Sequence, residues 1–298
     1  MKAPQALKKG DTIALVSTAR KISKPELNFA INLLNNWGLK VVFGEHLFEQ
    51  HHQFAGTDEQ RLLSFQECIN NPEIKAILCV RGGYGTVRII DQINFLPLVQ
   101  NPKWIIGYSD ITVLHNKLNN FGLESLHATM PINFETNTQL ALDSLRQTLF
   151  GEPLSYQVEN HELNQKGTAH GPVVGGNLSV LYSQLGSETR INTKGCILFL
   201  EDLDEYLYHI DRMMQNMARN GYFDEPAAVI IGGFTDMNDN NIPFGKTALQ
   251  ILFEYIGNRD YPVCFDFPAG HLNDNRALIF GRKAHLQVGQ TVSLTFDV

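Results

Sequence analysis

The sequence predicts an α/β fold in which a parallel sheet covered by helices is followed by a second α/β domain with a β-rich end. Through the first half of the chain, short apolar runs alternate with segments of helical periodicity. Glycine and polar residues separate these runs at the spacing of βαβ units. Near the C-terminus, over 277–298, short apolar stretches surround the turn Val288-Gly-Gln-Thr291, which indicates short strands.

The elements expected in the first half follow one another in a regular order. A strand over 12–17, a helix over 25–37 that ends at Gly38, and a strand over 39–43 form a βαβ opening. The same rhythm continues with a helix over 58–70, a strand over 76–80, a helix over 86–93 and a strand from Trp104. Ligands of such sheets bind at the carboxyl ends of the strands, so polar residues just after these strands are candidates for a site.

A linker is expected over 151–171, where the apolar periodicity fades into a polar stretch. Residues 1–150 would then form an N-terminal domain and residues 172–298 a C-terminal domain. In the second domain the patterns predict the following elements in order: a helix near 177–184, a strand over 196–200, a helix over 206–218, a strand over 227–231 and a strand-like run over 263–267.

Composition excludes several function classes. The chain has 298 residues and 43% hydrophobic content, enough for a sizeable core, and its net charge of -7 without a lysine or arginine block argues against a nucleic-acid or anionic-membrane surface. The first apolar run is too short for a signal peptide, and no stretch could span a bilayer. The four cysteines (Cys68, Cys79, Cys196 and Cys264) are widely separated, which indicates buried thiols in a reducing cytoplasm.

Ser109 stands where the sequence most strongly suggests chemistry. The run 104–106 predicts a strand, Gly107 permits a sharp turn, and helical spacing resumes behind the serine. A strand, turn and helix in this order lift a hydroxyl above the sheet and aim the following N–H groups at a bound group. Ile111 stands where a nucleophile elbow usually has its second glycine, so the turn also fits a plain helix cap.

A glutamate and a histidine also follow apolar strands. The run 196–200 is followed by the acidic cluster Glu201-Asp-Leu-Asp-Glu205. Glu201 comes first after the strand, so it is the member best placed to face a cleft and orient a histidine. Asp202, Asp204 and Glu205 suit the positively polarised start of the next helix. His271 follows the run 263–267 and Pro268-Ala-Gly270, where a loop can project an imidazole as a base. Strand ends bring distant residues together, so these positions can converge with Ser109.

The segment Arg81-Gly-Gly-Tyr-Gly85 lacks the Lys-Ser/Thr of a phosphate loop and the glycine spacing of a dinucleotide site. It fits either an oxyanion hole or a flexible turn. Asp236-Met-Asn-Asp-Asn-Asn241 begins like a calcium loop but lacks the glycine at position six, and Thr247 replaces the bidentate glutamate. We therefore expect no metal and no cofactor.

Several motifs together resemble one family, the LD-carboxypeptidases, which are serine peptidases that trim murein peptides. The similarity runs in order from Gly10-Asp-Thr-Ile13 nearly to the C-terminus, and its motifs are Phe54-Ala-Gly-Thr-Asp-Glu-Gln-Arg61, Ile77-Leu-Cys-Val-Arg-Gly-Gly-Tyr-Gly85, Ile106-Gly-Tyr-Ser-Asp110, Gly175-Gly-Asn-Leu178, Phe199-Leu-Glu-Asp202 and Gly270-His271. The resemblance implies a flavodoxin-like or amidotransferase-like N-terminal domain, a β-rich C-terminal domain and a homodimer. Ala128-Thr129 stands where relatives often have Gly-Pro, and His127 is given no role.

The resemblance also assigns roles to the strand-end residues. The family's nucleophile falls on Ser109, its glutamate on Glu201 and its histidine on His271, so all three residue types match. In such a mechanism His271 takes the serine proton while Glu201 holds the imidazole and stabilises its charged form. The implied substrate is a murein tetrapeptide in the cytoplasm, cleaved before its terminal D-alanine during cell-wall recycling.

The remaining roles fall on the glycine-rich segment and on the residue after the serine. The backbone N–H groups of Asp110 and of Gly82 or Gly83 are expected to bind the oxyanion. Arg81 is the nearest cation in sequence for the substrate's terminal carboxylate, and a buried structural ion pair is its other interpretation.

Two alternatives remain open at this point. The microcin C immunity peptidases resemble this family and cleave aminoacyl-nucleotide analogues, a substrate that would need aromatic side chains to stack the base. A catalytically silent ligand-binding protein of the same architecture is the other, and the three matching triad residue types argue against it.

Overall fold

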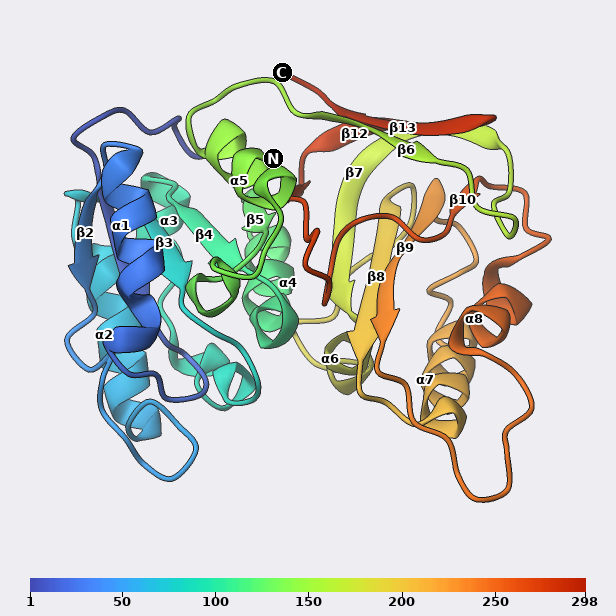
Figure 1. Ribbon diagram of the computed structural model, residues 1–298, viewed down its shortest axis with the longest axis horizontal. Coiled ribbons are helices and arrows are strands. Elements are labelled where there is room, and N and C mark those ends of the chain that lie inside the picture. Colours follow the sequence, from blue (N-terminus) through green and yellow to red (C-terminus); the bar gives the residue numbers. More distant parts are fainter.

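The computed structural model describes residues 1–298 and contains two sheets that lie side by side (Figure 1). The first sheet has six strands in the order β11-β5-β4-β3-β1-β2. Their bounds are β1 Thr12–Val16, β2 Lys40–Phe43, β3 Ile74–Cys79, β4 Trp104–Gly107, β5 Ser125–His127 and β11 Leu278–Phe280. The strands β1 to β5 run parallel and β11 pairs antiparallel with β5, which confirms the predicted α/β class with its parallel sheet.

Helices cover both faces of the first sheet because its strand residues are apolar in both directions. Ile13 and Leu15 belong to the same core cluster as buried residues of α1, whereas Ala14 and Val16 pack in the cluster that contains residues of α2 and α4. The helices of this half are α1 Asn28–Asn36, α2 Asp58–Asn70, α3 Leu96–Gln100, α4 Thr112–Asn120 and α5 Gln139–Leu149. A capping box of Thr57 and Gln60 fixes the start of α2.

The helix expected over 86–93 is instead two 3-10 turns, η2 Thr86–Arg88 and η3 Ile90–Gln92. Gly85 precedes them with a φ of 146°, outside the helical region and without a side chain that could cap a helix. The N–H and hydroxyl of Thr86 both donate to Asp110, so this turn is tied to the serine loop. Three further 3-10 turns are η1 Pro25–Leu27, η4 Ser109–Ile111 and η5 Pro131–Asn133.

The second sheet has seven strands in the order β10-β9-β8-β7-β12-β13-β6. Their bounds are β6 Ser155–Glu159, β7 Gly167–Asn177, β8 Ile197–Leu203, β9 Ala228–Thr235, β10 Val263–Cys264, β12 Lys283–Val288 and β13 Thr291–Phe296. The strands β7 to β10 are parallel, and β12, β13 and β6 extend the sheet in antiparallel fashion. The segment 151–171, expected as a linker, thus contains β6 and the start of β7, because Tyr156 and Val158 alternate inward and pair with β13.

The helices of the second half are α6 Leu178–Ser183, α7 Leu207–Arg219 and α8 Ala248–Ile256. Methionines of α7 and aliphatic residues of α8 share one core cluster with Leu198 and Leu200 of β8. The neighbouring strand residues Ile197 and Phe199 point the other way, into a cluster that also contains residues of the first half. In the parallel part of this sheet, one face therefore packs on its own helices and the opposite face packs towards the first half.

Two further expectations concern the chain as a whole. All four cysteines are buried and unpaired, as the sequence indicates. No helix combines the length and the apolar character that crossing a membrane requires.

Candidate active site

Ser109 lies on a strained turn at the carboxyl end of β4. Its φ is +65°, the left-handed region that costs a residue with a Cβ atom roughly 1–2 kcal/mol. Gly107 is required before it, since a Cβ atom there would lie 2.8 Å from Cγ1 of Ile111. The Ser109 hydroxyl forms no hydrogen bond within the chain and borders a cavity of about 470 Å³. The turn thus presents a free hydroxyl to a cavity, as the sequence pattern predicts.

A buried histidine supports this turn from beneath. Nε2 of His115 lies 2.8 Å from the carbonyl oxygen of Gly107, and its Nδ1 lies 2.9 Å from the hydroxyl of Ser125. Burial lowers the pKa of His115 to about 4, so its ring is neutral at ordinary pH. His115 is therefore a satisfied structural residue.

The glycine-rich loop after β3 lies directly beside the serine. A Cβ atom on Gly82 would be 3.3 Å from Oγ of Ser109 and 3.4 Å from the backbone nitrogen of Asp110. The carboxylate of Asp110 accepts hydrogen bonds from the N–H and hydroxyl of Thr86, at 2.9 and 2.7 Å. Burial raises the pKa of Asp110, and the hydrogen bonds from Thr86 oppose that effect. These bonds fix the loop so that Gly82 leaves open space next to the serine.

Arg61 holds the other end of the same loop and was missed in the sequence. Its guanidinium is almost fully buried and donates to the carbonyl oxygens of Thr18 and Gly85, while Asp58 neutralises it. A buried arginine so placed fixes loop conformation through several donors at once. Arg61 ends the motif Phe54-Ala-Gly-Thr-Asp-Glu-Gln-Arg61, which served above only as evidence for the family resemblance.

His271 and Glu201 form a close pair on the second half of the chain. Nδ1 of His271 lies 2.6 Å from Oε2 of Glu201, which also accepts the backbone N–H of His271 at 3.2 Å. Glu201 is fully buried, and the His271 side chain is 13% exposed and borders the same cavity as Ser109. The sequence-predicted residues Ser109 and His271 thus border one cavity, with no hydrogen bond between them, and Glu201 lies buried behind the histidine.

The sequence predicted that Glu201 would be the first residue after its strand. In the structure it lies within the strand, because β8 continues to Leu203. The strand extends because Asp202 and Leu203 still pair with β9. The Asp202 side chain accepts hydrogen bonds from the amide of Asn177 and from the N–H groups of Ser179 and Leu203. Side chains alternate along a strand, so Glu201 points the same way as Phe199, towards the first half of the molecule.

Two glycines in β9 make room for the histidine loop. The register between β8 and β9 shifts opposite Glu201, where Gly232 and Gly233 form an irregularity. A Cβ atom on Gly232 would lie 2.4 Å from the carbonyl oxygen of Ala269, and the N–H of Gly233 donates to that same oxygen. Such irregularities often lie beside active sites, where they direct a side chain. This Gly-Gly pair received no role from the sequence, although glycines inside an apolar strand run are a recognisable signal.

Electrostatics of the pair favour a charged histidine. Burial opposes the charge on His271, but the charge and hydrogen bond of Glu201, with a further contribution from Asp202, outweigh burial and raise the pKa of His271. Burial and the neighbouring charge of Glu201 raise the pKa of Asp202 to about 7. The ring of Tyr108 lies 4.8 Å from that of His271 and covers one side of it. The carboxylate therefore stabilises the imidazolium that a general base becomes.

The cavity carries cations from the first half and carboxylates from the second. Arg81 is partly exposed, donates to the carbonyl oxygen of Lys21 and forms no ion pair, so the buried ion pair considered for it is absent. Arg20, which follows β1, also borders the cavity and was not singled out in the sequence. On the other side Asp204 and Glu205 follow β8, and Glu205 is bonded to His209 at 2.6 Å.

Neither His127 nor the acidic residues at 201–205 form a metal site at the cavity. His127 is fully buried without a hydrogen-bond partner, and burial, with the charges of the neighbouring histidines, lowers its pKa well below the usual value. The cavity contains no group of three histidine, cysteine or carboxylate ligand atoms close enough to share an ion. The acidic residues at 201–205 are occupied by hydrogen bonds within the chain instead.

The geometry of this site is typical of one class of protein. A hydroxyl on a strained turn, open space beside backbone N–H groups, and a histidine held by a buried carboxylate are typical of hydrolases that use covalent catalysis. Models of the LD-carboxypeptidase N-terminal domain and C-terminal domain match residues 13–128 and 170–286. The chain therefore belongs to the LD-carboxypeptidase family, and its activity is that of a carboxypeptidase.

Individual relatives agree with this assignment over nearly the whole chain. The probable murein peptide carboxypeptidase of Bacillus subtilis is 34% identical over 98% of this chain and 93% of its own. The crystal structure of muramoyltetrapeptide carboxypeptidase from Oxalobacter formigenes covers 96% of this chain and 99% of its own, at a TM-score of 0.88 and 26% identity. The structure of MccF with glutamyl sulfamoyl guanosine has the same TM-score at 23% identity, covering 99% of this chain and 98% of its own, which shows a shared fold.

Proposed function

We propose that this protein is a serine carboxypeptidase that releases the terminal D-alanine from murein tetrapeptides. The observation that carries the proposal is the Glu201–His271 pair, whose histidine borders the same cavity as the strained turn of Ser109. The relative from Bacillus subtilis is named for murein peptides, and the one from Oxalobacter formigenes for a muramoyltetrapeptide. The substrate assigned here rests on these names and on the charges of the cavity.

In the proposed reaction Oγ of Ser109 attacks the carbonyl carbon of the L,D-peptide bond, and Nε2 of His271 takes its proton. The N–H groups of Asp110 and of Gly82 or Gly83 stabilise the oxyanion. As the C–N bond breaks, His271 returns the proton to the leaving amine of D-alanine. Water then attacks the acyl-enzyme with the same base, which restores Ser109 and frees the tripeptide. Catalytic hydrogen bonds often tighten only when substrate is bound, which fits the open Ser109–His271 contact here.

The charges around the cavity suit a substrate that carries both signs. Arg81 and Arg20 are placed to bind carboxylates, and guanidinium groups are well suited to that task. Asp204 and Glu205 can receive the ammonium group of a diaminopimelate or lysine side chain. A terminal D-alanine next to such a residue has these two features.

A peptidase of the microcin C immunity type is the second candidate, and the fold shared with MccF is its support. A nucleotide-like substrate would need an aromatic face on which the base could stack. Tyr108 and His271 are the aromatic rings at the cavity, and they pack against each other. Tyr108 is 6% exposed and the His271 side chain 13%, so neither ring offers an open face to a base, which favours the peptide.

We also propose a cytoplasmic location and a homodimer. The buried, unpaired thiols are those of a protein in a reducing compartment. Analytical ultracentrifugation of the purified chain tests the dimer, and a sedimentation coefficient of a monomer at micromolar concentration would contradict it.

The experiment that tests the proposed function compares three substrates on one preparation: a murein tetrapeptide, the corresponding pentapeptide and an aminoacyl-adenylate analogue. We expect release of D-alanine from the tetrapeptide alone, with full activity in a strong chelator. Cleavage of the adenylate analogue instead would select the second candidate. Binding of the tetrapeptide without turnover would indicate the catalytically silent protein.

Ser109→Ala is the matched variant for this assay. We expect it to abolish D-alanine release, because the hydroxyl is the attacking atom, and to leave the fold intact, because that hydroxyl forms no hydrogen bond in the chain. Residual activity above a few per cent, with an unchanged circular dichroism spectrum, would remove Ser109 from the mechanism. Ser183→Ala, on an exposed serine of α6 that bonds only within its own helix, controls for the loss of a surface hydroxyl.

A further inference from the structure

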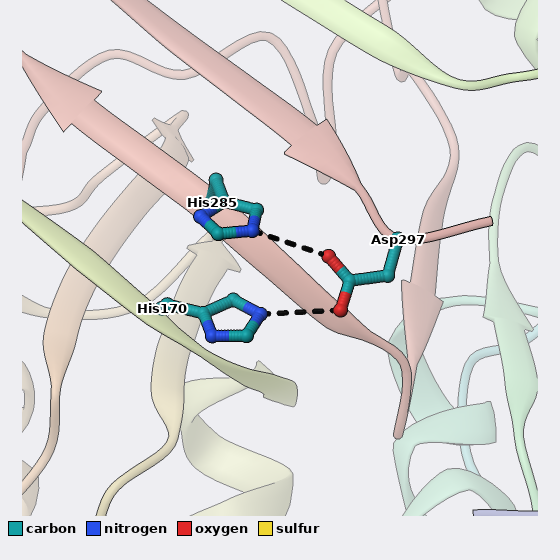
Figure 2. Close-up of side chains that lie close together, drawn as sticks. All are labelled: His170, His285 and Asp297. Carbon is teal, nitrogen blue, oxygen red and sulfur yellow. Dashed lines mark hydrogen bonds and ion pairs between the residues drawn. The ribbon is translucent and has the colours of Figure 1, made fainter.

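Three side chains that the proposed reaction does not use gather on the exposed face of the second sheet. His170 on β7 and His285 on β12 stand directly opposite each other, and their rings stack with centroids 3.9 Å apart. Asp297, just after β13, places one carboxylate oxygen 3.1 Å from Nε2 of His170 and the other 3.4 Å from Nε2 of His285. Figure 2 shows both rings turning the same edge towards this carboxylate.

The alternation of the strands explains why these groups are accessible. Along β12 and β13, residues such as Leu286 and Leu294 are buried in the core, while every second side chain points to solvent. His170 and His285 belong to the exposed set, with side chains 41% and 65% exposed. Neither ring is needed by the core. A metal ion can replace the proton through which Nε2 of His170 bonds to Asp297, because a ligating imidazole gives up that proton.

We propose that His170, His285 and Asp297 form a binding site for a divalent transition-metal ion of the Zn²⁺ or Ni²⁺ class. Two imidazoles and one carboxylate are a common ligand set for such ions, and imidazole disfavours Mg²⁺ and Ca²⁺. The site would supply three protein ligands and leave the remaining positions to water.

The geometry is close to what coordination requires. In a tetrahedral site with bonds of about 2.0–2.1 Å, neighbouring ligand atoms lie about 3.3 Å apart. Each Nε2 atom lies near this separation from a different oxygen of Asp297, at 3.1 and 3.4 Å. One ligand atom from each of the three residues lies within 4.8 Å of the other two. The parallel rings must tilt towards a common centre on binding, and their exposure leaves them free to rotate.

The site is separate from the cavity that holds Ser109. His170 lies seven residues before Asn177, which borders that cavity at the other end of the same strand. At about 3.3 Å per residue the two points are roughly 23 Å apart. The ligands come from β7, β12 and the end of β13, so an ion would connect these three segments. We therefore expect metal to stabilise the fold.

The test uses metal-free full-length protein and two readouts, isothermal titration with ZnCl₂ and the thermal unfolding midpoint. We expect one equivalent of Zn²⁺ per chain. At about a hundredfold excess over Kd the midpoint should rise by roughly 4 °C, because the ion binds only the folded state. Mg²⁺ at the same concentration should leave the midpoint unchanged.

Variants decide whether the ion binds at this place. His170→Ala and His285→Ala should each weaken Zn²⁺ binding more than about tenfold, because losing even an indirect partner of a metal site costs at least that much. The double change His51→Ala with His52→Ala is the matched control, since it removes two neighbouring exposed histidines from a loop elsewhere and should leave binding unchanged.

Two results would overturn the proposal. One is the absence of Zn²⁺ binding by the unaltered protein, in which case the three residues form only a cross-strand ion-pair cluster. The other is equal loss of affinity in the control and in the His170 and His285 variants, which would mean that surface histidines bind the ion without a defined site. Asp297→Asn adds an independent check, because it keeps the size of the side chain and should also weaken binding.

Discussion

Ser109 and Glu201 each lower the stability of the fold, the serine through its backbone conformation and the glutamate through burial of its carboxylate. The serine is held at a positive φ, and Oε1 of Glu201 is buried without a hydrogen-bond partner. A left-handed residue and an unsatisfied buried carboxylate oxygen each cost on the order of 1–3 kcal/mol. Costs of this kind persist where the surrounding structure enforces them, and they gather at functional sites. These two residues therefore support the proposed mechanism independently of the resemblance.

Glu201→Gln tests the role of the carboxylate. The amide keeps the size of the side chain but cannot stabilise the imidazolium, so we expect kcat to fall by roughly 10²- to 10⁴-fold with little change in KM. If Glu201 serves only to support the fold, turnover will stay near normal and the unfolding midpoint will drop. Measuring both quantities on one preparation separates the two roles, and near-normal turnover would make Asp202 the next residue to test.

The pH profile of the same variant gives a second readout. The pKa of His271 is raised in the native protein, and the base works only when neutral, so kcat/KM should fall on the acid side at a pH above the ordinary histidine value of about 6.5. In Glu201→Gln the main raising influence is gone while burial remains. The acid limb of kcat/KM should then move to lower pH, and an unmoved limb would assign that titration to another group.

Gly82→Ala tests the space beside the serine. The backbone of Gly82 has no positive φ, so alanine fits its conformation, but the new methyl group would stand 3.3 Å from Oγ of Ser109. We expect the unfolding midpoint to stay within a few degrees and kcat to fall by roughly 10²- to 10³-fold, as when an oxyanion donor is blocked. The exposed Gly186→Ala is not a suitable control because its φ is +84°. Gly289→Ala is suitable, since that position has an ordinary φ and free space around it.

At the scale of elements, side-chain hydrogen bonds connect the loops that follow β1, β3 and β4 at the carboxyl edge of the first sheet. Asp110 binds Thr86, whose hydroxyl lies 2.7 Å from that of Thr18, so the ends of β1, β3 and β4 share one buried polar chain. Asn177 at the end of β7 adds the second sheet, because its N–H donates to Thr112 at the start of α4. The relative positions of the proposed catalytic groups depend on these links.

Thr86→Val removes the hydroxyl from this chain and keeps the shape of the side chain. We expect a loss of roughly 1–3 kcal/mol in the free energy of unfolding, since the buried Asp110 carboxylate loses a donor, and a lower kcat because the Gly82 loop is less firmly held. Thr148→Val is the control, a buried threonine in α5 that bonds only within its helix. If both variants lower kcat equally, the effect is one of general stability.

Most strands and helices could be predicted from the sequence. The contacts that position the loops around the candidate site could not. Apolar runs and glycine turns sufficed for β1, β4 and α2, because local periodicity determines those elements. The Gly232–Gly233 irregularity and the buried Arg61 could not be assigned from one sequence, since their meaning depends on which distant backbone approaches them. The helix expected over 86–93 failed for the same reason: Thr86 is bonded to Asp110, a partner 24 residues away.

At the scale of the molecule, the two halves share a core. One cluster of 40 buried residues contains Ile13 and Leu15 of the first sheet together with Phe199 and Ile230 of the second. In addition β11, from the end of the chain, completes the first sheet. The predicted division into 1–150 and 172–298 therefore does not coincide with the two sheets: β11 belongs to the first, and β6 with the start of β7, inside the expected linker, belongs to the second.

A shared core predicts cooperative unfolding. Both tryptophans, Trp37 and Trp104, lie in the first half, so their fluorescence reports on that half, while far-ultraviolet circular dichroism reports on both. We expect the two signals to give the same urea midpoint. A fluorescence transition at a clearly different midpoint would show that the halves unfold separately, and the fragment 1–150 would then be expected to fold by itself.

The path of the chain between the two sheets has a consequence for the newborn protein. The ribosome makes Ser109 more than 160 residues before it makes His271 and β11. A nascent chain can begin to fold from its N-terminal side, but it then holds a hydroxyl without a base and a first sheet without its last strand. In the proposed mechanism, peptidase activity can arise only after His271 has been made. Polypeptides truncated before residue 271 would therefore pose no proteolytic hazard to the cell.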